Sequence, residues 1–307
     1  MDKVVDVINF ILLDGLMLVI LFLGISMLIF LAQQFSLGRS IEVKLANASS
    51  WNGATLAAIG GAVTPFCSCS TVPVLSGMLR SKIGLASCFT FLISSPVINE
   101  GVIILLVSGP GFGSAVIFVL SAALLSILAG ILVERTGMIR FLRPLGTVAV
   151  PEGYMGDSTG EVSRPKFRTA LSFSWGAARM ELRQIMPYLV IGIIIGGLIH
   201  GYMPENILTD LDHTFPPYFL IPLVALIAVP LYISPMAIVP IGYALIEKGM
   251  DPGPLVALLI SGAGTSLPEM ILLLRLFRWP LIVAHIVAVV TAAVILGFLA
   301  QWTIPNF

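Results

Sequence analysis

The sequence Thr64-Pro65-Phe66-Cys67-Ser68-Cys69-Ser70, with Pro73 three residues further on, interrupts an apolar stretch from Ala54 to Leu79. Two prolines and several hydroxyl side chains in such a stretch favour a helix that breaks inside a membrane, where the freed backbone groups need protein or water as partners. The stretch is too short for two spans of about 20 residues. We therefore expect a helical hairpin that enters the membrane and turns back; two thin spans are the alternative.

A second apolar stretch, from Tyr218 to Ile246, is interrupted in the same manner, at Pro230, Ser234-Pro235 and Pro240. We interpret it as a second helical hairpin of the same kind. Because the order of spans and breaks is the same before and after the middle of the chain, the sequence predicts two related halves.

Short matches between the halves support this interpretation. The segment Cys69 to Pro73 aligns with Met236 to Pro240, and Leu92-Ile93-Ser94 aligns with Leu259-Ile260-Ser261. A two-residue insertion then brings the segment from Ser95 to Glu100 against the segment from Thr265 to Glu269. This alignment makes Glu100 and Glu269 equivalent.

The composition places the chain in a membrane. Apolar residues make up 58% and charged residues 10% of the 307 residues, so a lipid-facing exterior is expected. The net charge of zero argues against a nucleic-acid partner. The long apolar runs predict spanning helices at Gly15 to Gln34, Gly84 to Val107, Phe112 to Val133, Met186 to Tyr202, Gly253 to Leu274 and Leu281 to Ala300.

Positive charge predicts the orientation. Eight of the 16 Lys and Arg residues lie in the connection 135–185, which should therefore be cytoplasmic and contain an interfacial helix. An odd number of crossings in each half leaves both termini outside and inverts the second half relative to the first. The predicted fold is an all-α polytopic protein of the cytoplasmic membrane with two inverted-topology repeats, 1–134 and 186–307. Each repeat has about three spanning helices and one broken re-entrant hairpin.

Two cysteines in the interruption from Thr64 to Ser70 are the strongest candidates for substrate contact. In extended backbone, Cys67 and Cys69 would point to the same side. Two thiols suit a soft ligand such as Cu(I), Zn(II) or a trivalent arsenical. Met236 would place a thioether opposite them, and Ser68 and Ser70 belong to the same segment. The alternative for both thiols is packing, which is the role we expect for Cys88.

Glu100 and Glu269 are candidates for proton coupling, because a carboxylate in mid-membrane costs about 2.5–3.5 kcal/mol on insertion scales and usually faces a cavity. Solvation near an interface is the alternative. Their neighbours would line the same cavity as hydrogen-bonding groups: Ser94, Ser95, Asn99, Thr265 and Ser266. His285 lies in the last span, where a packing role is expected and a proton relay is the alternative.

The run from Thr64 to Pro73 resembles the hallmark of a bacterial and archaeal family of predicted permeases that includes exporters of trivalent organoarsenicals such as methylarsenite. Ser94 to Asn99 and Gly264 to Pro268 also resemble that family's pattern. The resemblance implies an efflux permease with a thiol-bearing site at Cys67 and Cys69.

The sequence thus predicts a secondary-active permease that exports a thiophilic solute, with proton coupling, no cofactor and no enzymatic activity. A channel, or a copper or zinc efflux permease with Cys67 and Cys69 as soft metal ligands, is the alternative. The expected partners are the small solute and the lipid bilayer, and the sequence does not predict an oligomeric state.

Overall fold

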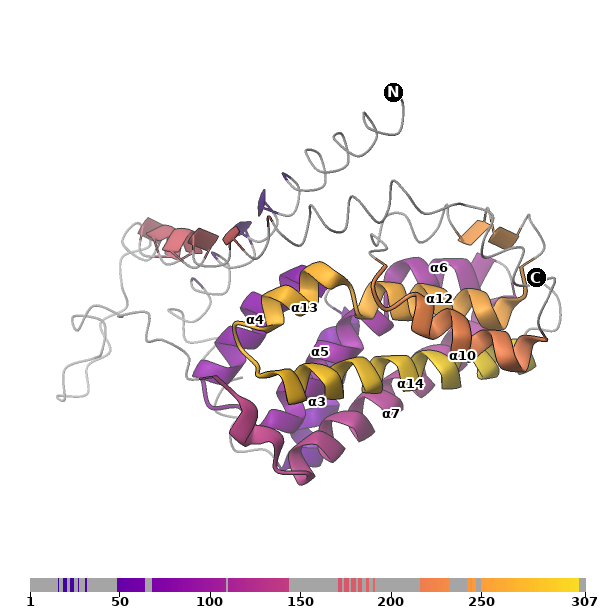
Figure 1. Cartoon of the computed structure of the whole chain (residues 1–307), viewed down its shortest axis with the longest axis horizontal. Coiled ribbons are helices and arrows are strands. Elements are labelled where there is room, and N and C mark those ends of the chain that lie inside the picture. The colour runs from indigo at the N-terminus through magenta and orange to yellow at the C-terminus, as the bar shows by residue number, and fades with distance from the viewer. Residues whose placement is uncertain are drawn as a thin grey trace.

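The computed structural model describes residues 49–63, 68–108, 110–143, 216–231 and 250–303, together with single residues within 16–31, 171–190 and 242–246. The first half contains α3 (Ser50–Val63), α4 (Ser68–Arg80), α5 (Leu85–Val97), α6 (Glu100–Ser108), α7 (Phe112–Arg135) and the short η1 (Met138–Phe141). The second half contains α10 (Pro217–Ile227), α12 (Pro252–Gly264), α13 (Leu267–Leu273) and α14 (Trp279–Thr303). Figure 1 shows their arrangement.

The described chain contains helices that are long and apolar enough to cross a membrane. The 24 residues of α7 and the 25 residues of α14 each meet this condition, and α12 with α13 meets it as one segment of 22 residues. The pair α5 and α6 also passes but is bent by 48° at its break. A helix rises about 1.5 Å per residue, so 24 residues cover about 36 Å, more than the hydrocarbon core. The expectation of an all-helical membrane protein is confirmed.

The two halves repeat with one constant offset. α3 and α10 begin at Ser50 and Pro217, and this separation of 167 residues (217 − 50) recurs between the starts of α5 and α12, of α6 and α13, and of α7 and α14. No insertion is needed. The two-residue insertion that the sequence comparison suggested is therefore wrong.

A close helix contact is repeated at the same offset. A Cβ atom built on Gly130 of α7 would lie 2.5 Å from the carbonyl oxygen of Ala86 in α5. The equivalent Gly297 of α14 would meet the carbonyl oxygen of Gly253 in α12 at 2.9 Å. Backbone oxygens of a packed helix move little, so each long helix needs glycine where it crosses its partner.

We expect Gly130→Ala and Gly297→Ala each to lower stability by about 1–3 kcal/mol, because the new methyl group overpacks a helix crossing. Thermal unfolding of the purified protein in detergent measures this loss. Gly113→Ala is the control, since it adds a methyl group in α7 with no atom within 4 Å. Equal melting temperatures for Gly130→Ala and Gly113→Ala would contradict the contact.

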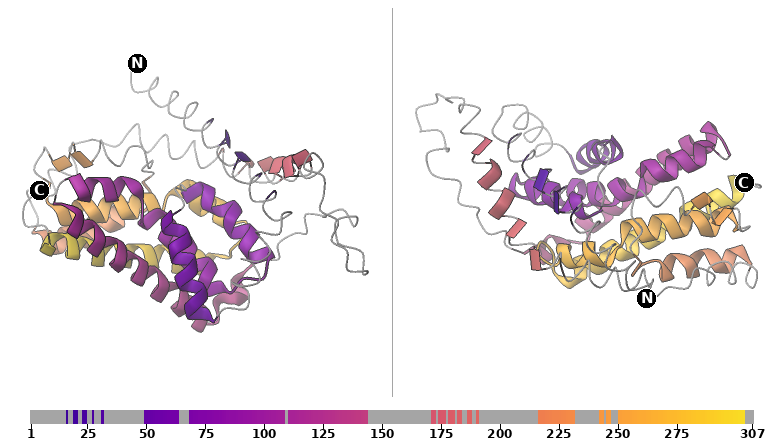
Figure 2. Two further views of the ribbon diagram at one scale, coloured as in Figure 1. Left: turned by 180° about the vertical axis from the view of Figure 1, so that it is seen from behind. Right: turned by 90° about the horizontal axis from the view of Figure 1, so that it is seen from above.

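The equivalent helices α7 and α14 lie side by side and run in opposite directions (Figure 1). An isolated antiparallel bridge between Leu142 and Phe277 joins the segment that follows α7 to the segment that precedes α14. The helices α5 and α12 also contact each other. Seen from above, the helices of the two halves form two adjoining groups (Figure 2).

Each half also contributes a short helix to the other. The helix α13 contacts α4 of the first half. At the equivalent place in the other half, the Tyr243 hydroxyl donates a hydrogen bond to Ser108 Oγ of α6 at 2.6 Å. A Cβ atom on Gly242 would lie 2.8 Å from Leu105 Cδ2, also in α6. Residues 242 and 243 fall within the offset range that corresponds to α4. Reciprocal contacts thus join short segments of the two halves.

The first predicted hairpin forms two helices that lie apart. The helices α3 and α4 each pack against α5 and make at most minor contact with each other. The helix α4 already begins at Ser68 and continues through Pro73. The expectation of extended backbone through Cys69 is therefore wrong, because the helix starts one residue before that cysteine.

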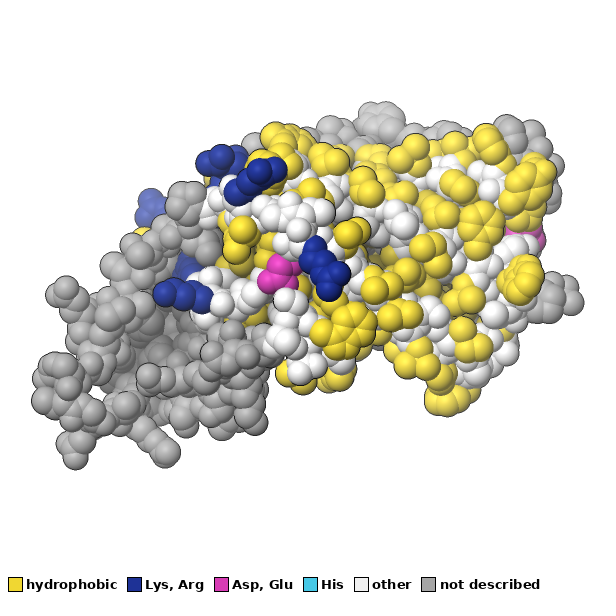
Figure 3. Space-filling model, turned by 90° about the horizontal axis from the view of Figure 1, so that it is seen from below, with side chains coloured by type: hydrophobic (Ala, Val, Ile, Leu, Met, Phe, Trp, Pro, Cys, Tyr) yellow, Lys and Arg dark blue, Asp and Glu magenta, His cyan; other side chains and the backbone are white. Residues whose placement is uncertain are grey.

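Charge separates the two ends of the molecule. The basic residues on the described surface gather at one end, whereas apolar side chains cover most of the rest (Figure 3). The described basic residues include Arg80 at the end of α4, Arg135 at the end of α7, Arg140 in η1, and Arg143, Arg275 and Arg278 around the bridge between Leu142 and Phe277. A broad apolar surface with charge confined to the ends is expected for a protein whose solvent is lipid.

Exposed aromatic side chains mark both ends at equivalent positions. The long helices begin with Phe112 and Trp279, whose side chains are 74% and 63% exposed. Trp51 at the start of α3 and Tyr218 at the start of α10 form a second exposed pair with the same offset. Aromatic residues are enriched at both membrane–water interfaces, so these pairs indicate where the two interfaces lie.

Three predicted features lie outside the described residues. These are the spans Gly15 to Gln34 and Met186 to Tyr202, and the connection 135–185 beyond Arg143. Only single residues of each are described.

Candidate functional site

The candidate site is built from two helix breaks, one in each half. The first break separates α5 from α6 at Ile98 and Asn99, and the second separates α12 from α13 at Thr265 and Ser266. The backbone N–H of Ile98 donates to Ser94 O at 2.8 Å, and the N–H of Thr265 donates to Ser261 O at 3.0 Å. The same cap thus ends α5 and α12 at the same position of the repeat.

Different residues begin the following helices. In the first half, Asn99 Oδ1 accepts a hydrogen bond from the N–H of Gly101 at 2.7 Å, which satisfies a free donor in the first turn of α6. In the second half, Ser266 precedes α13, and the proline in the first turn of that helix brings no N–H that needs a partner. Two unrelated sequences therefore produce the same break.

Buried polar side chains concentrate at both breaks. Ser261 Oγ donates to the carbonyl oxygen of Ala225 at 2.6 Å, and Thr265 Oγ1 donates to Ser261 O at 2.6 Å. Ser95 Oγ is buried and has no hydrogen-bond partner in the described part of the chain. The other fully or almost fully buried polar residues of this region are Ser94, Asn99, Ser266, Glu269 and His285.

The two breaks meet between the halves. A Cβ on Gly264, the last residue of α12, would lie 3.8 Å from Pro96 Cγ in α5. The sequence-predicted residues Ser95 and Thr265 are the chain neighbours of these two. The structure therefore brings the predicted polar groups of both halves to one region where broken helices cross.

His285 of α14 closes this region on one side. Its Nε2 lies 3.0 Å from the carbonyl oxygen of Gly264, which places the ring proton on Nε2. The ordinary helical partner of that oxygen would be the N–H of residue 268, but Pro268 has none. His285 thus satisfies a backbone group freed by the helix break, which is a structural role.

The same nitrogen lies 3.8 Å from Glu269 Oε1, and both side chains are fully buried. The ring of Phe89 contacts His285 edge-on with centroids 6.0 Å apart. His285 Nδ1 has no partner among the described residues. At 3.8 Å the carboxyl group and the imidazole are close but not hydrogen-bonded, because Nε2 already donates to the carbonyl oxygen of Gly264.

The glutamates are not equivalent in the repeat. Glu100 is the first residue of α6 and corresponds to Leu267, whereas Glu269 is the third residue of α13 and corresponds to Val102. The expected symmetric pair is therefore wrong, because no insertion separates the halves. The pairing of Glu269 with His285 was missed, since 16 residues and a turn separate them in the sequence.

The predicted thiol site lies largely outside the described residues. Cys67 and Met236 are not described, and Ser68, Cys69 and Ser70 are placed only as the first turn of α4. The side chain of Glu100 is likewise outside. Cys88 is fully buried in α5, where its thiol points to Ile83 O at 3.7 Å. Among the described residues, no group of three metal-ligating side chains is found.

Comparison with known proteins gives a consistent result. The profile of a family described as "Predicted permease" matches residues 3–302. A UPF0718 protein of Methanocaldococcus jannaschii is 22% identical over 80% of this chain and 81% of its own length. The UPF0718 protein YraQ of Escherichia coli K12 is 23% identical over 82% of this chain and 68% of its own.

A third relative comes from Streptococcus mutans and is proposed to be a subunit of a two-component membrane permease complex. It is 26% identical over 71% of this chain and 69% of its own length. No solved structure matches the chain.

Proposed function

Because the chain belongs to the predicted permease family, we propose that it is a secondary-active permease that carries a small solute across the cytoplasmic membrane. One observation carries this proposal: broken helices from the two halves cross between Pro96 and Gly264, and buried polar side chains gather there. Broken helices at a repeat interface are where transporters bind substrate, because unwound backbone offers polar groups inside the membrane.

We infer that the two halves are inverted repeats. The antiparallel course of the equivalent helices α7 and α14 supports this relation, as does the reciprocal exchange of short helices. The first broken stretch also supports a re-entrant path. A Cβ on Gly61, near the end of α3, would contact Ser94 near the end of α5, so these helices run in the same direction. Since α4 returns to the start of α5, the chain enters and leaves at one end.

The proposal that the substrate is thiophilic is based on the cysteines in the sequence. Cys69 belongs to the first turn of α4, a helix that packs against α5 and α13, and Cys67 precedes that helix in the sequence. Soft thiol ligands favour a trivalent arsenical or a soft metal ion over a hard cation. We propose export of a trivalent organoarsenical such as methylarsenite, with Cys67, Cys69 and Met236 as the soft groups.

We propose that proton coupling resides in the second half. Glu269 and His285 are in contact and fully buried, whereas their repeat equivalents Val102 and Phe118 are apolar and buried. A titrating pair on one side of a pseudo-symmetric carrier lets protonation favour one of its two conformations. Glu100 remains a second candidate for carrying a proton.

A channel is the alternative, because facing re-entrant segments also line pores. The contact between Glu269 and His285 favours a carrier, since a passive pore has no need of a buried titrating pair.

Growth of a sensitive host tests the substrate. Cells that lack their own arsenical exporters and express the chain should tolerate more methylarsenite than cells with an empty vector. Parallel cultures with copper and zinc test the metal alternative. Equal growth with and without the chain under all three challenges would contradict export of a thiophilic solute.

The basic end should face the cytoplasm, because positive residues are retained on that side. In intact cells, an impermeant maleimide should label Pro110→Cys and reach Thr136→Cys only after permeabilisation, relative to the parent chain. These residues flank α7 at its two ends. The opposite labelling pattern would contradict the orientation, and labelling of both positions from outside would contradict a span at α7.

A further inference from the structure

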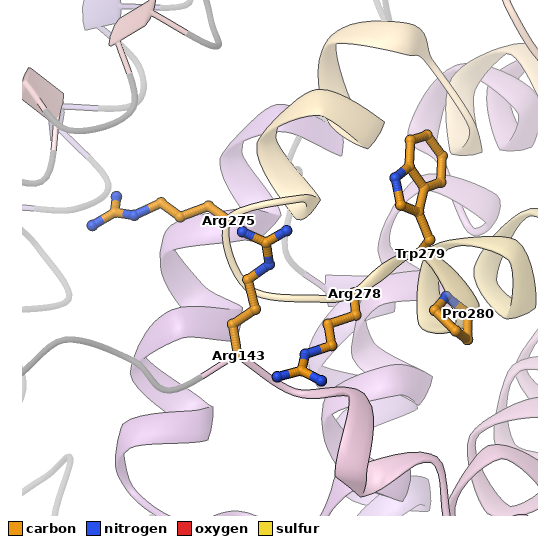
Figure 4. A pocket seen from close by; sticks show the side chains of 5 residues that line it. All are labelled: Arg143, Arg275, Arg278, Trp279 and Pro280. Atoms are coloured by element: carbon orange, nitrogen blue, oxygen red, sulfur yellow. The ribbon is translucent and has the colours of Figure 1, made fainter.

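We propose that the basic end holds a binding site for the phosphate headgroup of an anionic phospholipid. The site is an open pocket of about 800 Å³ lined by Arg143, Arg275, Arg278, Trp279 and Pro280 (Figure 4). It lies apart from the helix breaks and has no part in the proposed transport site. It does rest on the proposed location of these residues at the cytoplasmic interface.

The fold holds the backbones of two arginines next to each other. The N–H of Arg143 donates to Leu276 O, and the N–H of Arg278 donates to Phe141 O, both at 2.9 Å, around the bridge between Leu142 and Phe277. Phe277 is fully buried, so alternation along the bridge turns Arg143 and Arg278 to the outer face. In Figure 4 their guanidinium groups extend in different directions, so the two arginines place positive charge on separate sides of the pocket.

Neither Arg143 nor Arg278 forms an ion pair with a carboxylate of the described residues. Arg275 extends away from the other two in Figure 4 and widens the basic surface. A bound anion would neutralise this positive charge, and guanidinium groups match phosphate in geometry and charge.

The surroundings identify the anion as part of a lipid. Trp279 is 63% exposed at the start of α14, the position that a tryptophan occupies at headgroup level. Val283 and Val287 follow one and two turns further along the same face and are 51% and 58% exposed. An acyl chain can lie along this apolar stripe while its phosphate reaches the arginines.

Comparison of equivalent positions in the two halves shows that the arginines are present at only one end of the described chain. At the opposite end, Phe112 takes the place of Trp279, but Gly111 takes the place of Arg278. Both ends thus have an interfacial aromatic residue, and only the basic end adds arginine. Basic pockets of this kind on the cytoplasmic side of membrane proteins bind anionic headgroups.

Native mass spectrometry of the detergent-purified full chain tests the proposal. We expect retention of phosphatidylglycerol over phosphatidylcholine. The Arg143→Gln/Arg278→Gln variant should weaken retention by about 25-fold, at about fivefold for each arginine. The Lys82→Gln/Arg135→Gln variant loses the same charge at the same end outside the pocket and should change retention by less than about threefold.

Inorganic phosphate at millimolar concentration serves as the headgroup without acyl chains and should displace little phosphatidylglycerol. Equal retention of both lipids, or an equal effect of both double variants, would overturn the site. Full displacement by inorganic phosphate would show a free-anion site instead of a lipid site. Stronger lipid retention after neutralising Glu152, Asp157 and Glu161 would show that the chain's own acidic segment occupies the pocket.

Discussion

Replacing Glu269 with Gln should leave the protein folded but abolish the pH dependence of transport and reduce gradient-driven accumulation to simple equilibration. The amide keeps the size of the carboxyl group and removes both its titration and the burial cost of its charge, which is about 2.5–3.5 kcal/mol on insertion scales. Transport by everted vesicles over a range of external pH measures this effect. Thermal unfolding of the same variant checks that it folds.

Two further variants separate coupling from packing. His285→Gln keeps a donor for the carbonyl oxygen of Gly264 but removes the titrating ring, so the pH profile should change while stability is largely preserved. Glu134→Gln makes the same carboxyl-to-amide change near the basic end of α7 and should leave the profile unchanged. A wild-type pH profile in Glu269→Gln, in Glu100→Gln and in their double variant would assign both glutamates a structural role.

Replacing Cys67 and Cys69 with Ser should remove most export of a thiophilic solute. A monosubstituted trivalent arsenical has two exchangeable positions, so two thiols can hold it. Loss of groups that merely orient metal ligands already lowers affinity by about 10–100-fold, and loss of a soft ligand itself should cost at least as much. Each single Ser variant should impair export, and the double variant should be the most affected.

Cys88→Ser is the matched control for the same chemical change. Its thiol is buried in α5 beside the backbone, away from the broken segment, so export should stay near the wild-type rate. Serine nearly retains the size of cysteine and loses its soft-ligand character, which isolates chemistry from packing. Normal export by the Cys67/Cys69 double variant would show that these thiols pack and that backbone and hydroxyl groups form the site.

The sequence predicted the helical class and the spans at α7 and α14. These features follow from apolar length, whereas residues such as Asn99 and Pro268 have a local effect on a helix. The polar residues Ser95, Asn99, Thr265 and Ser266 could be chosen for the same reason. Each lies beside a point where backbone must leave the helix.

The residue-by-residue alignment of the two halves could not be predicted as accurately from the sequence. Aligning Glu100 with Glu269 needs a two-residue insertion, whereas the constant offset aligns Asn99 with Ser266 and Glu100 with Leu267. Different residues end a helix equally well, so identity at a break is a poor guide to equivalence. The contact between Glu269 and His285 depends on the geometry of the connection between α13 and α14. The sequence of neither helix determines that geometry by itself.

Transport by the purified protein in liposomes under an imposed proton gradient tests the central claim most directly. With methylarsenite as solute, a proton-coupled carrier should accumulate it above the equilibrium level on the side with the higher proton concentration, and this accumulation should collapse when a protonophore is added. Entry that reaches only equilibrium and is insensitive to the protonophore would contradict a proton-coupled carrier and favour a channel.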